Sequence, residues 1–447
     1  MEEETGMTDG VNIRELALGV LLEVTKEGSY SHLVLRAVLE KYQYLEKQER
    51  AFLTRVSEGT IQRMIELDYI IDQFSRVKVK KMKPVIRNIL RMSVYQMFYM
   101  DSVPDPAACN EAVKLARKKG FSSLSGFVNG VLRNISRNKE TIIYPDEKKN
   151  PVFALSVRYS MPEWIVKEWI GAYGVEQTKF VLAAFLEEEP ITIRTNLLKT
   201  TPEQLKERLI AEGVTVEPLD DTKYKGLSYA YAISGFDHLR ALPSFQEGLF
   251  YVQDVSSMMV TELAEIKEGA YVIEVCAAPG GKSIHLAEKM NGTGMVEARD
   301  LTDYKVSLIE ENIARHQLSN VKAVCMDATV FQKGSVECAD VLIADLPCSG
   351  LGILRKKTDI KYRMSKEQQQ ELIALQRKIL DTVCTYVKHG GTLIYSTCTI
   401  NRGENEENVA WFVENHPEFE LKEERQLFPG EGPGDGFFLS KLIRKQV

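Results

Sequence analysis

The sequence lacks the patterns that mark several common classes of protein. None of its seven cysteines forms a Cys-x-x-Cys pair, so the usual spacing of a zinc site is absent and we expect no metal. An odd number of cysteines also argues against a disulfide framework. No apolar run approaches the roughly 18 residues that a membrane helix needs, and the acidic start Met1–Glu4 is unlike a signal peptide. These absences predict a cytoplasmic protein with no membrane partner.

Acidic residues are missing from two stretches near the N-terminus, although the whole chain carries a net charge of −6. Residues 76–91 hold seven Lys or Arg, and residues 114–139 hold seven more. Either run alone is explained as an ordinary solvated helix face. Because a clustered basic face attracts phosphates whatever the net charge of the chain, two such runs in one segment favour a surface that binds RNA.

The apolar pattern divides the 447 residues into three regions, and we expect a multidomain protein. Residues 1–140 repeat apolar side chains every three or four positions, which predicts an all-α domain. After a polar linker, residues 150–250 mix helices with short strands and predict a small α/β module, which we expect to bind RNA. Strands and helices alternate over residues 251–447, which predicts a Rossmann-like α/β domain with a mostly parallel sheet. A long loop precedes the last predicted strand, so this strand can run antiparallel to the others. The predicted strands are 271–276, 295–299, 322–326, 341–344, 392–395 and 437–443.

A turn with two adjacent glycines follows the first strand of this domain. Its residues are Cys276, Ala277, Ala278, Pro279, Gly280, Gly281 and Lys282. Glycine lets a ligand approach the backbone closely, and the helix that begins at Lys282 favours negative charge at its N-terminus. The turn has neither the first glycine of a P-loop nor the G-x-G-x-x-G pattern, so we expect a ligand without a pyrophosphate.

Aspartates close three successive strands of the same domain, at Asp300, Asp327 and Asp345. A single aspartate at a strand end is more often a helix cap, but three in series favour a binding site. Asp300 stands 19 residues after Gly281, where a carboxylate can accept hydrogen bonds from ribose hydroxyls, and Asp327 is suited to the adenine amino group. A nucleoside that carries an amino-acid carboxylate and no phosphate fits this set, and S-adenosylmethionine is such a molecule.

Two strand ends also present a cysteine. The strings are Asp345-Leu346-Pro347-Cys348-Ser349-Gly350 and Ser396-Thr397-Cys398-Thr399-Ile400. Ligands of open α/β sheets bind beyond the carboxyl ends of the strands, so we expect both thiols and the Asp345 carboxylate to face one crevice. A pyrimidine C5 becomes nucleophilic when a thiolate adds to C6, and that addition needs an acid or donor at N3. Cys398, Cys348 and Asp345 fit these roles, with Asp345 protonated or sharing a proton with N3, whereas Cys276 is interpreted as structural.

The three strings together resemble the Sun- and Nop2-type RNA cytosine-C5 methyltransferases. The N-terminal stretch, notably residues 87–96 and 127–134, resembles the NusB-like RNA-binding domain, and the likeness covers nearly the whole chain. The resemblance implies that Cys398 is the nucleophile, that Cys348 assists product release and that Lys282 reaches the active site. It implies that residues 276–282, Asp300, Asp327 and Asp345 contact S-adenosylmethionine or the target base. The implied product is 5-methylcytidine in 16S ribosomal RNA, either naked or in a partly assembled small subunit, and we expect a monomer.

Other functions compete with this one. The helical region alone is compatible with a non-catalytic RNA-binding or antitermination factor, which the intact cysteine strings disfavour. A DNA cytosine methyltransferase would use the Pro-Cys thiol, here Cys348, as its nucleophile, and methylation of a different RNA also stays open. The chain departs from the family pattern at Glu274, where Asp is usual, and at Leu346, where Ala is usual.

Overall fold

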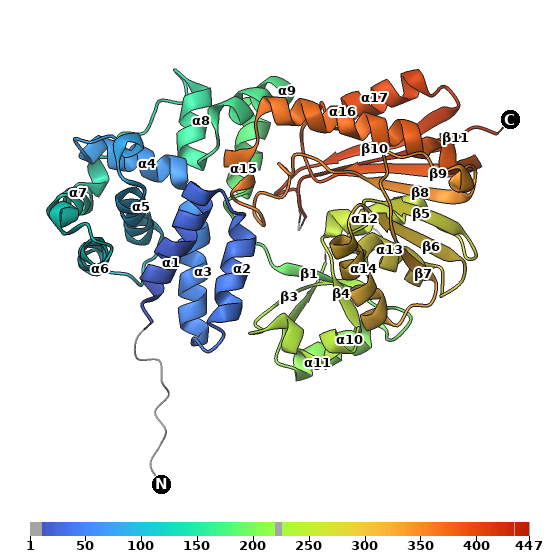
Figure 1. Cartoon of the computed structure of the whole chain (residues 1–447), viewed down its shortest axis with the longest axis horizontal. Coiled ribbons are helices and arrows are strands. Elements are labelled where there is room, and N and C mark those ends of the chain that lie inside the picture. The colour runs from blue at the N-terminus through green and yellow to red at the C-terminus, as the bar shows by residue number, and fades with distance from the viewer. Residues whose placement is uncertain (1–10, 220–225, 433, 447) are drawn as a thin grey trace, which may run out of the picture. The chain divides into compact units, whose positions relative to one another are not determined.

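A computed structural model of the chain describes residues 11–219, 226–432 and 434–446 (Figure 1). Contacts divide the chain into two compact units, residues 1–186 with 354–363 and residues 187–353 with 364–447. Residues 1–10 of the expected helical domain and residues 220–225 of the expected α/β module lie outside the described part.

The first unit is helical throughout its described residues, as the apolar spacing predicts. The spaced residues Ile86, Ile89 and Val94 are at most 1% exposed, because the face that carries them packs into the core. Its helices are α1 (Ile13–Leu22), α2 (Ser31–Lys41), α3 (Lys47–Gln62), α4 (Met64–Phe74), α5 (Pro84–Tyr99), α6 (Asp105–Lys118), α7 (Ser125–Arg137), α8 (Pro151–Tyr159), α9 (Glu163–Ala184) and the short α15 (Ile360–Arg363).

A segment from far along the chain, residues 354–363, belongs to this helical unit. Lys361 Nζ donates a hydrogen bond of 2.7 Å to the carbonyl of Gln62, and Ser31 Oγ lies 2.5 Å from Asp359 Oδ1. Helices α8 and α9 belong to the same unit, whereas the sequence groups residues from 150 onward with the α/β module. The division into three domains therefore stays a prediction.

The second unit begins with a small antiparallel sheet in the order β2-β3-β1-β4. Its strands are β1 (Ile191–Thr195), β2 (Thr215–Pro218), β3 (Ala230–Ser234) and β4 (Phe250–Val252), with helices α10 (Pro202–Ala211) and α11 (Pro243–Gln246). Ile193, Leu205, Leu209 and Phe250 form its buried core. This is the predicted α/β module, although the sequence analysis missed β3 and β4.

A seven-stranded sheet in the order β10-β11-β9-β8-β5-β6-β7 forms the rest of the second unit (Figure 1). Strands β5 to β9 run parallel, and β11 lies antiparallel to both β9 and β10. The prediction of a mostly parallel sheet is confirmed. The strands are β5 (Tyr271–Val275), β6 (Met295–Asp300), β7 (Val321–Cys325), β8 (Ala339–Asp345), β9 (Val387–Thr397), β10 (Phe419–Leu427) and β11 (Phe437–Arg444).

Helices cover both faces of this sheet. Helices α12, α13 and α14 lie on one face and α16 and α17 on the other (Figure 1). Apolar residues of both groups pack against the strands. The helices are α12 (Val255–Ala264), α13 (Gly281–Lys289), α14 (Asp303–His316), α16 (Lys366–Val383) and α17 (Glu406–Asn415). In such a doubly wound sheet the chain reverses its winding between β5 and β8, which is where ligands bind. Among the described residues, no helix is both long and apolar enough to cross a membrane.

Candidate active site

Most of the predicted site residues gather at the carboxyl ends of β5, β8 and β9, three adjacent strands of the large sheet, whereas Asp300 closes β6 and Asp327 follows β7. Asp345 closes β8, and its register partner on β9 is Ser396. Cys348 and Cys398 follow these two strands closely, since β8 ends at residue 345 and β9 at residue 397. Parallel strands bring their carboxyl ends to one edge, so the sheet itself explains why two strings 50 residues apart meet.

The two sulfurs lie 3.2 Å apart, and both cysteines are free thiols. Backbone bonds fix their loops: the N–H of Leu346 donates to the Ser396 carbonyl at 3.1 Å, and that of Gly352 donates to the Cys398 carbonyl at 3.0 Å. The hydrogen bond with Cys398 and burial raise the pKa of Cys348, and the charge of Glu404 raises it further. Cys348 is therefore held as a thiol that can donate a hydrogen bond to Cys398.

A charged pair lies beside the thiols. Lys282 Nζ is 2.5 Å from Asp345 Oδ2, and Ser396 Oγ donates to Asp345 Oδ1 at 2.8 Å. Burial acts to lower the pKa of Lys282, but the charges of Asp345 and Glu274 and the hydrogen bond to Asp345 outweigh it and raise the pKa. Asp345 is therefore the ion-pair partner of the Lys282 ammonium group, which its carboxylate contacts directly.

The glycine turn after β5 is fixed by backbone and side-chain bonds. Gly280 has φ +97°, a left-handed conformation that favours glycine, and directly precedes α13. Asp300, which is 2% exposed, accepts the N–H of Ala278 at 2.9 Å and that of Leu301 at 2.7 Å. Burial raises the pKa of Cys276 to about 12, and the charges of Asp300 and Asp345 act in the same direction, so this thiol is unreactive.

Asp327 follows β7, the edge strand of the large sheet. Strands β5 and β6 separate β7 from β8 and β9, the strands that precede the two thiols. Its Oδ1 accepts both the N–H and the hydroxyl of Thr329 at 2.8 Å, and these bonds lower its pKa. It therefore closes a turn in the way that isolated strand-end aspartates often do. Oδ2 of Asp327 has no hydrogen-bond partner within the described ranges, so the carboxylate keeps an oxygen for a ligand.

Two residues of the site were missed by the sequence analysis. Leu301, next to Asp300, is 58% exposed although it is large and apolar. Glu404 is 0% exposed and accepts the N–H of Ser349 at 2.8 Å, beside Cys348. The sequence predicts a helix over residues 404–415, which in fact begins at Glu406, and no sequence signal distinguishes Glu404 from the exposed acids that follow it.

Comparison with known proteins places the chain in a family. A Bacillus subtilis (strain 168) protein named "Probable ribosomal RNA small subunit methyltransferase B" is 37% identical, and the match covers 97% of this chain and 99% of that protein. This chain belongs to the ribosomal RNA small subunit methyltransferase B family. A Synechocystis protein (strain ATCC 27184 / PCC 6803 / Kazusa) of the same name is 32% identical over 92% of this chain and 90% of its own length.

Three family profiles match successive parts of the chain. The profile "16S rRNA methyltransferase RsmB/F" matches residues 261–443, "NusB family" matches 11–137, and "Methyltr_RsmF/B-like, ferredoxin-like domain" matches 161–225. The crystal structure titled PH0851 has a TM-score of 0.79 with 24% identity, covering 97% of this chain and 99% of that one, which supports the fold. The expected fold class, the methyltransferase class and the S-adenosylmethionine-dependent type are confirmed for this family member.

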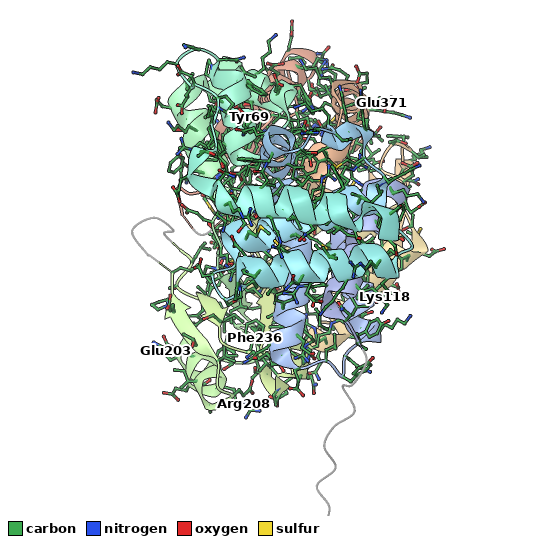
Figure 2. All side chains as sticks on the ribbon, turned by 90° about the vertical axis from the view of Figure 1, so that its left-hand side faces the viewer. Tyr69, Lys118, Glu203, Arg208, Phe236 and Glu371 are labelled. Carbon is green, nitrogen blue, oxygen red and sulfur yellow. The ribbon has the colours of Figure 1, made fainter. Side chains whose placement is uncertain are left out.

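Apart from Lys139, the basic residues of the two runs lie in the part that matches the NusB family. Several of their members are paired with acids of the same unit: Arg91–Asp68, Lys114–Glu111, Lys118–Glu15, Lys119–Glu15 and Lys139–Asp105. Lys118 nevertheless lies at the surface, as Figure 2 shows, with 59% of its side chain exposed. Lys80, Lys81 and Lys83 are exposed and form no ion pair with any residue that the structure describes.

Proposed function

We propose that this chain methylates C5 of a cytosine in 16S ribosomal RNA through a covalent bond between Cys398 and C6 of the base. The observation that carries the proposal is the 3.2 Å contact of two thiols beside the Lys282–Asp345 pair, at the edge of the sheet where ligands bind. Because Cys348 is held as a thiol, the neighbouring Cys398 is the better candidate for the attacking thiolate.

The residues of the glycine turn fit S-adenosylmethionine. Gly280 caps α13 without a side chain, so the first N–H groups of this nine-residue helix are open to the carboxylate of a ligand. Asp300 is held by two N–H groups, and its Oδ1 also lies 3.1 Å from Lys305 Nζ, so Oδ2 is the oxygen that keeps a lone pair for a ribose hydroxyl. We assign the adenine to the space between Asp327 and the exposed Leu301 side chain. When bound, this molecule supplies an electrophilic methyl group on a sulfonium.

Addition of the thiolate begins the reaction. Cys398 Sγ bonds to C6, and the electron pair displaced from the C5–C6 double bond moves towards N3, which takes a proton from the Lys282–Asp345 pair. C5 is then enamine-like and takes the methyl group. The ammonium of Lys282 and the hydroxyl of Ser396 keep Asp345 oriented while the proton moves.

Release of the product reverses the addition. The proton on C5 passes to water, the C5–C6 double bond forms again, and the C6–S bond breaks as N3 returns its proton to the pair. The thiol of Cys348 donates a hydrogen bond to the departing sulfur, which stabilises the thiolate that leaves. Without that donor the covalent protein–RNA intermediate should persist.

The exposed lysines of residues 76–83 are suited to bind the phosphates of RNA. The names of the relatives support ribosomal RNA of the small subunit as the substrate, and a cytoplasmic site of action follows from that substrate. That the enzyme acts as a monomer stays a prediction.

Mapping of 5-methylcytidine tests the proposal. Purified enzyme with S-adenosylmethionine should place the mark at one cytosine of a 16S transcript or of a partly assembled subunit, and deletion of the gene should remove that mark from the cell's 16S RNA. If the enzyme methylates another RNA and not 16S RNA, the proposed substrate is wrong although the proposed reaction stands. Absence of both methylation and S-adenosylmethionine binding would favour the non-catalytic RNA-binding factor.

A further inference from the structure

One buried carboxylate contacts the loops of both reactive cysteines. Glu404 lies between β9 and α17 and is 0% exposed. Its Oε2 accepts the N–H of Ser349 at 2.8 Å, directly after Cys348. Its Oε1 accepts the side-chain amide of Asn401 at 3.1 Å, three residues after Cys398. A single side chain thus bridges two loops that are far apart in the sequence.

Gln376 of α16 extends this bridge to the other side of Cys348. Its Nε2 donates to Glu404 Oε2 at 3.0 Å and to the carbonyl of Pro347 at 2.9 Å. Its Oε1 accepts Nδ2 of Asn408 at 2.7 Å, which fixes the orientation of the amide. The peptide groups before and after Cys348 are therefore both held, one through Gln376 and one through Glu404.

The bridge suits a carboxylate and no other common side chain. Three N–H donors converge on its two oxygens, and each is buried and points to the same group. Burial raises the pKa of Glu404, while the bonds from Ser349, Gln376 and Asn401 act in the opposite direction. Hydrogen bonds to a charged acceptor are stronger than those between neutral groups, and a buried donor left without an acceptor is destabilising.

We propose that Glu404 is a positioning residue for product release, because it holds the sulfur of Cys348 against that of Cys398. The proposal rests on the function proposed above, in which Cys348 donates a hydrogen bond to the departing sulfur. Loss of the bridge should let the Cys348 loop move away while leaving the Lys282–Asp345 pair, the glycine turn and Cys398 able to begin the reaction.

Glu404→Gln tests this inference with a nearly isosteric change. Glutamine has one oxygen, so its amide nitrogen must face at least one of the three donors. We expect the covalent adduct with a 16S transcript to rise about tenfold and multiple turnover to fall about tenfold, while single-turnover methyl transfer stays within about threefold of wild type. Denaturing gels measure the adduct, and labelled S-adenosylmethionine measures the transfer.

Two further variants make the test specific. Glu407→Gln is the matched control, because Glu407 is an exposed glutamate of the same segment, and it should behave as wild type. Adding Asn401→Asp to Glu404→Gln should lower the adduct to the wild-type level. The new carboxylate at position 401 can accept both the amide introduced at position 404 and the Gly403 N–H that Asn401 Oδ1 now accepts at 3.0 Å. A double variant with the adduct level of the single one would contradict the hydrogen-bond account.

The outcomes separate this inference from the proposed function. Cys348→Ala is measured in parallel: if it accumulates adduct and folded Glu404→Gln releases its product normally, the role of Glu404 is refuted and the function stands. If Cys348→Ala accumulates no adduct and Cys398→Ala still turns over, the proposed function itself fails. Should Glu404→Gln not fold, Gln376→Met removes two bonds of the bridge and leaves Glu404 in place. Adduct accumulation in Gln376→Met supports the inference, and normal release overturns it.

Discussion

At the scale of single residues, the two thiols differ in what surrounds them. Cys348 is held between peptide groups that Gln376 and Glu404 fix, and the charge of Glu404 disfavours its thiolate. Cys398 lies on the other side of the 3.2 Å contact, and Lys282 lies close enough for the charge of Cys398 to raise the lysine's pKa. The raised pKa of Cys348 suits this thiol to donate a hydrogen bond, which leaves Cys398 as the proposed nucleophile.

Replacement of each cysteine should therefore give a different result. Cys398→Ala removes the nucleophile, so turnover should fall at least about 10³-fold and no covalent RNA adduct should form. Cys348→Ala removes only the donor to the departing sulfur, so it should still attack RNA and accumulate the adduct. Turnover assays and denaturing gels check both variants, and an exchange of the two phenotypes would assign the nucleophile to Cys348, as in DNA cytosine methyltransferases.

Asp345→Asn should slow the addition step. The amide cannot share a proton with Lys282, and it leaves the ammonium without its charged partner at 2.5 Å. We expect kcat to fall by about 10²–10³-fold, within the usual range for loss of an acid–base group, and adduct formation to slow in step. Rapid-quench measurement of adduct formation checks this, with Asp303→Asn on the same domain as the control. A normal rate of adduct formation in Asp345→Asn would remove the pair from the mechanism.

At the scale of elements, β5 carries a buried acid beneath the glycine turn. Glu274 is 1% exposed and accepts the hydroxyl of Ser283. Burial raises the pKa of Glu274 from 4.5 to about 7, although Lys282 and Ser283 act against the rise. This is where the family usually has Asp, and the longer side chain still reaches α13.

The raised pKa makes folding stability depend on pH. Between pH 4.5 and 7 the folded protein binds more protons at Glu274 than the unfolded chain does, so the free energy of unfolding should fall as pH rises through this window. Glu274→Gln should remove that part of the pH dependence and be more stable than wild type above pH 7, by about 2–3 kcal/mol. Urea unfolding of both proteins from pH 4.5 to 8 checks this, and parallel stability curves would show that Glu274 has an ordinary pKa.

Local pattern was enough to predict the elements that are both buried and regular. All five parallel strands were predicted because each contains several apolar or β-branched residues in a short segment bounded by helices or turns. Strand β10 was missed because it lies at the sheet edge and most of its residues, such as Glu423 and Glu424, are exposed, so it shows no apolar alternation. β4 has only three residues, too few to show a periodicity, whereas β3 is as long as β1 and its apolar residues were overlooked.

The candidate site was predictable as far as strand order implies proximity. The two cysteines and Asp345 were expected in one crevice because they follow adjacent parallel strands. The contact between Lys282 and Asp345 depends on the direction of the two side chains. The bridge through Glu404 depends on which residues are buried. The spacing of residues along the sequence predicts neither contact. The charge of the basic runs was also only partly predictable. The sequence shows which residues are lysines, but only the structure shows that Lys118 and Lys119 form ion pairs with Glu15.

At the scale of the whole molecule, we expect the two units to carry different tasks. Charge reversal of Lys80, Lys81 and Lys83 to Glu in the helical unit should weaken RNA binding and reduce the salt slope by about 0.7–0.9 for each phosphate that is no longer neutralised. Affinity for S-adenosylmethionine, a property of the other unit, should not change. The matched control reverses Lys148, Lys149 and Lys167, which lie in the same unit outside the two runs and are also exposed. If both triple variants bind RNA with equal affinity across a salt series, residues 76–83 are an ordinary solvated surface that does not bind RNA.

The covalent bond between Cys398 and the base is tested most directly by trapping it in the wild-type enzyme. A 16S transcript that contains 5-fluorocytidine cannot lose a proton from C5, so the intermediate should stay attached after methyl transfer. Mass spectrometry of the digested complex should then find a methylated fluorocytidine on the peptide that carries Cys398. The same adduct on the peptide that carries Cys348, or no adduct in an enzyme that methylates ordinary 16S RNA, would contradict this account.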